Sequence, residues 1–284
     1  MKYNYYFSGI LALVRVFLIS VAFVFVKKLD GEISSVILLL IRSSFSFLLL
    51  TPLFIKQGLK VTNTNKLNLH FLRGVFGSAA MFCIYYSSRQ LPLALSSTIA
   101  MSLPLFITLL SCVILRENIR QKQWTLLILG YIGVTISLNP FHASIIDSSI
   151  FVSILANIFL ALSIISTKTL SKLDSASTIM FYYNLLLVLI SVIFTRDINI
   201  DITYNNMVIL FSIGLISVFT QFCSIKSLSY STPAFVAPFE YTRLVFAIPL
   251  GFIFFEEYPD IYILTGAAII IYSNIMLAKI NNVN

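Results

Sequence analysis

The chain has 284 residues, of which 58% are hydrophobic and only 11% are charged, and its formal net charge is +8. A soluble domain carries about 25% charged residues, so this composition excludes an ordinary water-soluble protein. In a membrane protein, a positive balance indicates basic cytoplasmic loops rather than binding to nucleic acid.

Long apolar segments separated by short polar breaks follow one another along the whole chain. A helix needs about 20 mostly apolar residues to cross a bilayer. The sequence therefore predicts an all-α membrane protein with ten transmembrane helices and the lipid bilayer as its solvent. The predicted helices lie near residues 7–26, 33–55, 70–88, 92–115, 124–140, 148–168, 177–195, 204–226, 233–255 and 260–278.

The connections between these segments are too short to hold a soluble catalytic or ATP-binding domain, and the phosphate-binding loop motif is absent. Cys83, Cys112 and Cys223 fall inside apolar segments without a metal-binding spacing. His70 and His142 lie at helix ends in different loops, which disfavours an intramembrane enzyme. We therefore expect no catalytic residues, no cofactor and no metal.

The distribution of basic residues predicts the orientation in the membrane. With the N-terminus in the cytoplasm, eleven Lys and Arg fall on the cytoplasmic side and four on the far side. The eleven are Lys2, Lys56, Lys60, Lys66, Arg116, Arg120, Lys122, Lys168, Lys172, Lys226 and Lys279; the four are Lys27, Lys28, Arg89 and Arg196. The positive-inside rule then predicts cytoplasmic N- and C-termini in a bacterial inner membrane.

An internal repeat divides the chain, since residues 74–133 align with residues 214–273 at a constant offset of 140. Each half holds five predicted helices, and an odd number forces the second half to enter the membrane upside down. This predicts two inverted five-helix repeats, residues 1–140 and residues 148–280, with a substrate site near the membrane midplane between them.

Loop charges agree with the inversion. The loop at residues 116–122 is basic, whereas its counterpart at residues 256–260 is acidic, although Glu117 aligns with Glu257. Opposite charge at equivalent positions is expected if the two loops face opposite sides of the membrane.

Two stretches carry a family resemblance. LPLALSSTIAMSLPLFITLLSCVILRENIRQKQW at residues 91–124 and STPAFVAPFEYTRLVFAIPLGFIFFEEYPDIYILTGAAIII at residues 231–271 resemble the EamA family of the drug/metabolite transporter superfamily. Arg42 and the LRG at residues 72–74 also fit the family pattern. APFEYTRLVFA at residues 237–247 looks most like the branch that contains the rickettsial S-adenosylmethionine uptake transporters.

The resemblance implies EamA-type repeats and a secondary transporter that works by alternating access. The family moves amino acids, purines, drugs and other metabolites, so membership implies a transporter without naming its cargo. An EamA-type exporter of amino acids, purines or drugs is therefore an alternative, and a non-transporting membrane scaffold is an alternative of another class. The chain is expected to act as a monomer or a homodimer.

Four ionisable residues lie deep in predicted helices: Arg15, Arg42, Glu240 and Arg243. Such residues are costly in a bilayer and usually face a cavity or a partner. Glu240 and Arg243 are one turn apart and share a helix face. We predict that these groups bind the charged ends of a small zwitterionic or anionic metabolite, S-adenosylmethionine or an amino-acid-like solute. The alternative is that an arginine only neutralises Glu240 as a structural pair.

Uncharged polar residues add a second group of candidates for substrate binding. Tyr241 lies deep in its predicted helix, where its ring could stack on an aromatic or cationic ligand. The others are Ser97, Thr98, Asn157 and Gln221. Hydrogen bonding between helices is the commoner use of such residues, so both interpretations remain open.

Overall fold

The computed structural model describes residues 4–29, 33–90, 99–138, 148–195, 203–256 and 261–282, and these residues contain helices and no β-strand. The predicted all-α fold is therefore confirmed. The first half contains α1 (Tyr5–Lys28), α2 (Ser35–Gln57), the 3-10 helix η1 (Gly58–Val61), α3 (Leu67–Gln90), α5 (Leu103–Leu115) and α6 (Gln121–Leu138). The second half contains α7 (Ser148–Leu170), α8 (Ala176–Phe194), α9 (Tyr204–Tyr230), α10 (Pro233–Val236), the 3-10 helix η3 (Ala237–Tyr241), α11 (Thr242–Phe255) and α12 (Ile261–Asn282).

Seven helical stretches within these described ranges are long and apolar enough to cross a membrane. Each of the ten predicted segments contains helix, but ten spans are not confirmed. The thirteen residues of α5 reach only about 20 Å, less than the hydrocarbon core of a bilayer, and part of its predicted segment lies outside the described residues. The α6 helix begins with the polar run at residues 121–123, which lowers its hydropathy.

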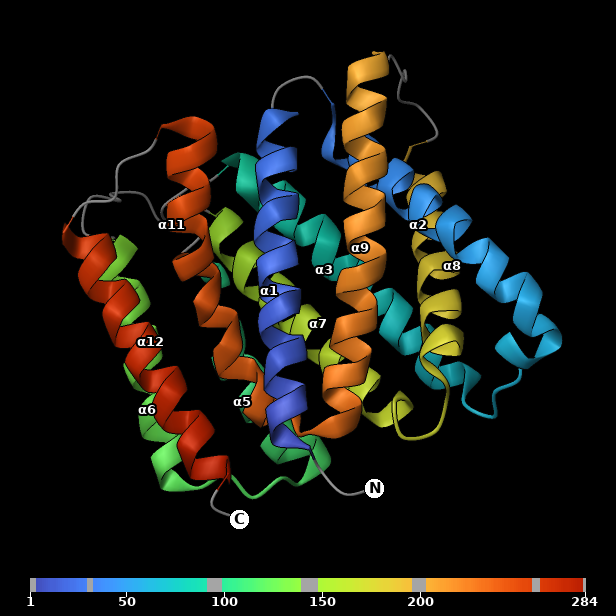
Figure 1. Cartoon of the computed structure of the whole chain (residues 1–284). Coiled ribbons are helices and arrows are strands. Elements are labelled where there is room, and N and C mark those ends of the chain that lie inside the picture. The colour runs from blue at the N-terminus through green and yellow to red at the C-terminus, as the bar shows by residue number, and fades with distance from the viewer. Residues whose placement is uncertain are drawn as a thin grey trace.

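Helix packing is related between the two halves. α3 packs along α7, and their equivalents in the other half, α9 and α1, also pack along each other. In the same way α5 contacts α7, and their equivalents α11 and α1 are in contact. Likewise α2 contacts α9, and their equivalents α8 and α3 are in contact. Two pairs of equivalent helices also pack directly on each other, α2 on α8 and α6 on α12. Figure 1 shows α1 beside α9 at the front and α6 beside α12 at the left. This exchange of neighbours fits a two-repeat architecture.

The outer surface of the bundle is apolar, as a lipid environment requires. Large side chains such as Ile55, Val113, Phe151, Ile193 and Ile253 are more than half exposed. Exposed apolar surface of this extent would be unfavourable in water. Small polar side chains instead gather between helices, where Ser43, Ser78, Ser111, Asn184, Ser191 and Ser227 are buried.

The ninth predicted helix is discontinuous, because the 3-10 helix η3 separates α10 from α11. Pro238 lies in this segment and lacks the backbone N–H that a regular helix needs. A turn at Met101 and Ser102 interrupts the chain just before α5, and these residues align with Tyr241 and Thr242 at the repeat offset. Irregular backbone at depth is tolerated where it is buried in protein or lines a cavity.

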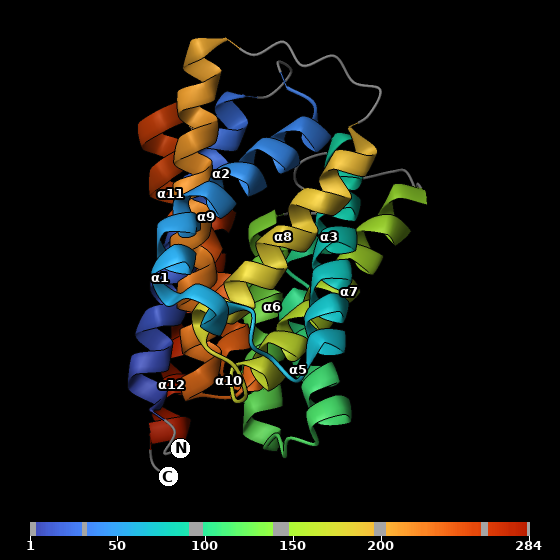
Figure 2. The same cartoon turned by 90° about the vertical axis from the view of Figure 1, so that its right-hand side faces the viewer.

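The first and last described helices meet at one end of the bundle. The start of α1 and the end of α12 are at the same end of the bundle, which is also where α9 ends (Figures 1 and 2). After α9 ends here, the chain leads through a short connection into α10 and η3, the start of the discontinuous helix.

Candidate functional site

Two arginines converge on one carboxylate at η3, the interruption between α10 and α11. Arg15 on α1 donates from Nη1 to Oε1 of Glu240, and Arg243 on α11 donates from Nη2 to Oε2 at 3.1 Å. Glu240 is 3% exposed, Arg15 is buried and the Arg243 side chain is 22% exposed. We call these three residues the ion-pair cluster, which holds two positive charges and one negative charge.

The local sequence explains how Glu240 reaches the interior. Glu240 lies in η3, which follows Pro238 and precedes α11, so its side chain projects from the irregular part of the helix. The Thr242 hydroxyl donates to the carbonyl oxygen of Phe239 at 2.6 Å and so satisfies an acceptor within this segment. Phe235 and Phe239 pack with Ala12 of α1, holding η3 against the helix that carries Arg15.

Arg243 retains hydrogen-bonding capacity beyond its bond to Glu240. Its guanidinium carbon lies 5.5 Å from the centre of the Phe23 ring. Its Nε atom is buried and has no hydrogen-bond partner among the described residues. A guanidinium has five N–H donors in a planar fork that suits a carboxylate. Arg243 is therefore the member of the ion-pair cluster best able to accept an additional anion.

Tyr241 lies beside the ion-pair cluster in sequence but faces a packed environment. It is fully buried, and a Cβ built on Gly130 of α6 would lie 2.6 Å from its ring. The Tyr241 hydroxyl has no hydrogen-bond partner within the described ranges. The ring therefore fills the space against α6, and Gly130 is needed for its close approach.

Asn157 joins α7 to the other helix interruption. Its Nδ2 atom donates to the carbonyl oxygen of Ile99 at 2.6 Å and lies 3.1 Å from the Ser102 hydroxyl oxygen. Asn157 therefore links α7 to the turn before α5, where the Ile99 carbonyl oxygen also accepts from the Ser102 N–H and hydroxyl. Ser97 and Thr98, which were also predicted to contribute, lie outside the described residues.

Gln221 and Arg42 have different surroundings. The amide groups of Gln221 and Asn184 exchange two hydrogen bonds of 3.2 Å and link α9 to α8. Arg42 is half-buried on α2, and its Nε atom has no hydrogen-bond partner in the described part of the chain. The described contacts of neither residue include the ion-pair cluster.

Two further basic residues are buried that the sequence alone did not single out as site residues. Lys168, which was counted with the cytoplasmic loops, is 1% exposed and donates to the carbonyl oxygens of Leu228, at 2.7 Å, and Ser231. Arg73 lies 4.3 Å from the Tyr183 ring centre and donates to the Thr167 hydroxyl at 2.7 Å. Lys168 lies two residues before the last residue of a long apolar helix, a position from which a lysine ordinarily reaches water.

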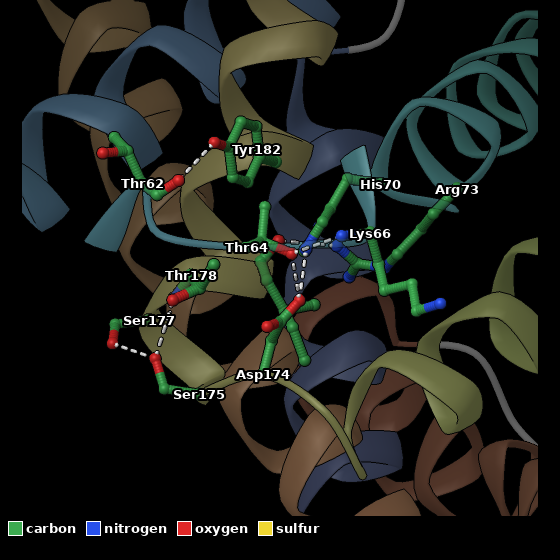
Figure 3. Close-up of polar contacts among 11 residues, drawn as sticks. Thr62, Thr64, Lys66, His70, Arg73, Asp174, Ser175, Ser177, Thr178 and Tyr182 are labelled. Atoms are coloured by element: carbon green, nitrogen blue, oxygen red, sulfur yellow. Dashed lines mark hydrogen bonds and ion pairs between the residues drawn. The ribbon is translucent and has the colours of Figure 1, made fainter. Parts of the chain in front are cut away.

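A separate polar network joins the start of α3 to the α7–α8 turn (Figure 3). Asp174 accepts a hydrogen bond of 2.8 Å from Thr64, and its Oδ2 atom also lies 2.8 Å from Nε2 of His70. Nearby, Tyr182 donates to the Thr62 carbonyl oxygen at 2.8 Å (Figure 3). These contacts tie the two halves of the chain together.

Comparisons with known proteins agree with this architecture. A sequence profile of the EamA-like transporter family matches residues 7–139 and again residues 147–278. An S-adenosylmethionine uptake transporter of Rickettsia bellii is 28% identical over 252 residues, covering 88% of this chain and 86% of that protein. A pseudopaline exporter of Pseudomonas aeruginosa is 26% identical, covering 96% of each chain.

More distant matches extend the same result. A riboflavin transporter of Brucella anthropi is 24% identical, covering 87% of this chain and 89% of that protein. One solved structure superposes with a TM-score of 0.81 at 13% identity, covering 96% of this chain and 97% of the other, which shows the shared fold. The names of the family and of these relatives describe transporters rather than enzymes. The chain is a multi-pass membrane protein that belongs to the EamA-like transporter family.

Proposed function

We propose that the chain is a secondary transporter that moves a small zwitterionic or anionic metabolite, S-adenosylmethionine or an amino-acid-like solute, across the bacterial inner membrane by alternating access. The observation that carries the proposal is the ion-pair cluster, a buried site with one net positive charge at a helix break. Discontinuous helices at the interface of repeats are the usual place for a transporter's substrate site.

The chemistry of such a solute matches the ion-pair cluster. A substrate carboxylate would bind the Arg243 guanidinium, whose Nε donor has no partner among the described residues, and a substrate ammonium or sulfonium would approach Glu240. Each substrate charge would thereby replace one partner of an existing ion pair, which limits the cost of desolvation. The S-adenosylmethionine uptake transporters among the relatives support this substrate class.

The remaining substrate contacts would come from further polar residues on several helices. We include Arg42, Asn157, Gln221, Tyr241, Ser97 and Thr98 in this wider site as predictions. The proposal also includes two inverted repeats, residues 1–140 and residues 148–280, with both termini in the cytoplasm. The exchange of helix neighbours between the halves supports the two-repeat part of this proposal. An EamA-type exporter of other metabolites is the main alternative, because one relative is named as an exporter.

The proposal is tested by uptake of radiolabelled S-adenosylmethionine, amino acids and purines into cells that express the protein, with and without an uncoupler. Glu240→Gln and Arg243→Ala are expected to abolish uptake while the protein still inserts into the membrane. Lys122→Ala, at an exposed position on α6, is the matched control and should transport normally. Normal uptake by both site variants would exclude this site, and no flux of any solute would favour a scaffold.

A further inference from the structure

The α9–α10 connection is held by contacts from three other parts of the chain. Directly before α1, the Asn4 backbone N–H donates to the Tyr230 carbonyl oxygen at 3.0 Å. Ser8 and Ser227 each donate from the hydroxyl to the other's carbonyl oxygen at 2.9 Å. We call the contacts on residues 227–234 the terminal latch, because α9 ends at the same end of the bundle where α1 begins and α12 ends (Figure 1).

Lys168 supplies the positive charge of the terminal latch from α7. Its ammonium donates to the carbonyl oxygens of Leu228 and Ser231, which belong to the last turn of α9 and its cap. A cation at the C-terminal end of a helix compensates carbonyl groups that have no partner within the helix. The attraction between Lys168 and Glu117 brings a carboxylate into the same latch.

Glu117 supplies the negative charge from the end of α5. Arg116 adopts a left-handed conformation with φ of 54°, which turns the chain so that the Glu117 backbone N–H donates to the Ser111 carbonyl oxygen. The Glu117 carboxylate accepts hydrogen bonds from the Ser111 hydroxyl and from the backbone N–H of Ala234. Glu117 therefore connects α5 directly to α10.

The surroundings of Glu117 favour proton uptake. Burial raises the pKa of its carboxyl above the usual value, and the hydrogen bonds and the charges of Lys168 and Lys172 oppose this rise only in part. The charged groups that act on Glu117 within the described ranges are Lys168 and Lys172 from the α7 side, and Cys112 on α5 is a titratable group on which the Glu117 charge acts. A carboxyl with a raised pKa binds a proton nearer to physiological pH than an exposed glutamate does.

We propose that Glu117 is a proton-binding residue whose protonation opens the terminal latch and so couples protons to transport. With the carboxylate ionised, Glu117 attracts Lys168, accepts the Ala234 N–H and holds α10 against α5. When a proton adds to one carboxylate oxygen, the charge attraction is lost and the bond to Ala234 weakens. The inference rests on the proposed alternating-access function and adds a coupling ion and its site.

The latch is mechanically connected to the ion-pair cluster. α10 leads directly into η3, which carries Glu240. Ser8 lies seven residues before Arg15 on α1, or about 10 Å along the helix. Release of α10 and of the start of α1 therefore acts on both helices whose side chains form the Arg15–Glu240 ion pair.

The test is thiol labelling of a single cysteine in nanodiscs, which needs no transported solute. Cys83, Cys112 and Cys223 are replaced by alanine, and Ala234→Cys is introduced in the buried part of the latch. Its labelling rate is divided by that of Asn118→Cys, an exposed position, to remove the intrinsic pH dependence of thiol chemistry. Above the pKa of Glu117, the protonated fraction rises about tenfold for each unit of falling pH, and the normalised rate should rise with it.

Glu117→Gln removes the charge and is expected to label rapidly at every pH. Glu256→Gln is the matched control, because Glu256 is exposed and occupies the equivalent left-handed cap of α11; it should retain the pH dependence. A normalised rate that does not change with pH, or a pH dependence that persists in Glu117→Gln, would overturn the proposal. Neither outcome bears on the substrate, so failure of the latch and failure of the substrate proposal are distinguishable.

Discussion

Glu240 accepts hydrogen bonds from two arginines in a site almost closed to water, and this arrangement sets the cost of changing any one of them. Removing one member of a buried ion pair leaves an uncompensated charge and costs about 3–5 kcal/mol. The spacing of Glu240 and Arg243 by three residues made their contact predictable from the sequence. The contact of Glu240 with Arg15, 225 residues away, depends on how α1 packs against η3.

A double-mutant cycle measures this long-range contact. Arg15→Met and Glu240→Met are each expected to destabilise the protein, and the double variant should be more stable than the sum of the two effects by about 0.5–3 kcal/mol. The measurement is denaturant unfolding of purified protein in detergent. Lys122→Met, at an exposed position, should change stability by no more than about 0.5 kcal/mol. Strict additivity of the two changes would contradict the observed ion pair.

At the scale of elements, the two helix interruptions depend on residues from other helices. The sequence contains prolines in both regions, which indicates bends but not the 3-10 geometry of η3. At one interruption an additional donor comes from another helix, since Asn157 of α7 donates to the Ile99 carbonyl oxygen beside the local bonds from Ser102. Sequence reasoning identified Asn157 as polar at depth but could not choose between a ligand and a helix as its partner.

Asn157→Leu is expected to lower stability by about 0.5–1.5 kcal/mol, because it removes the donor that α7 supplies to the Ile99 carbonyl oxygen, which keeps its bonds from the Ser102 N–H and hydroxyl. Thermal unfolding in detergent measures the loss. Asn205→Leu, at an exposed position near the start of α9, is the control and should have little effect. Equal stability of Asn157→Leu and the parent protein would show that the bond to Ile99 contributes nothing to the fold.

Gly130→Ala is expected to destabilise the packing of η3 against α6, because the added Cβ would lie 2.6 Å from the Tyr241 ring. Overpacking of this kind costs about 1–3 kcal/mol. Tyr241→Leu, combined with Gly130→Ala, should recover part of the loss by removing the ring. Ile132→Ala on the exposed face of α6 is the control. A Gly130→Ala protein as stable as the parent in thermal unfolding would argue against this close contact.

At the scale of the whole molecule, Lys and Arg are in excess on one set of loops, and the start of α1 and the end of α12 lie at one end of the bundle. Together these two features lead to one topology prediction. Green fluorescent protein fused after Asn284 should be fluorescent, and alkaline phosphatase fused there should be inactive. Phosphatase fused after residue 143, between the two halves, should be active. The reverse pattern of activities would contradict cytoplasmic termini.

The sequence by itself determined the fold class, the membrane as solvent and the family, because hydropathy, repeat spacing and motif residues can be read from the order of residues alone. It also indicated Arg15, Glu240 and Arg243 as candidate site residues, since a charged residue inside an apolar segment is recognisable from the sequence. The tertiary structure decided which of these groups meet, that Gln221 pairs with Asn184, and that Lys168 is buried in the terminal latch. Those contacts join residues far apart in the chain, and only the packing of one helix against another determines which side chain lies opposite which.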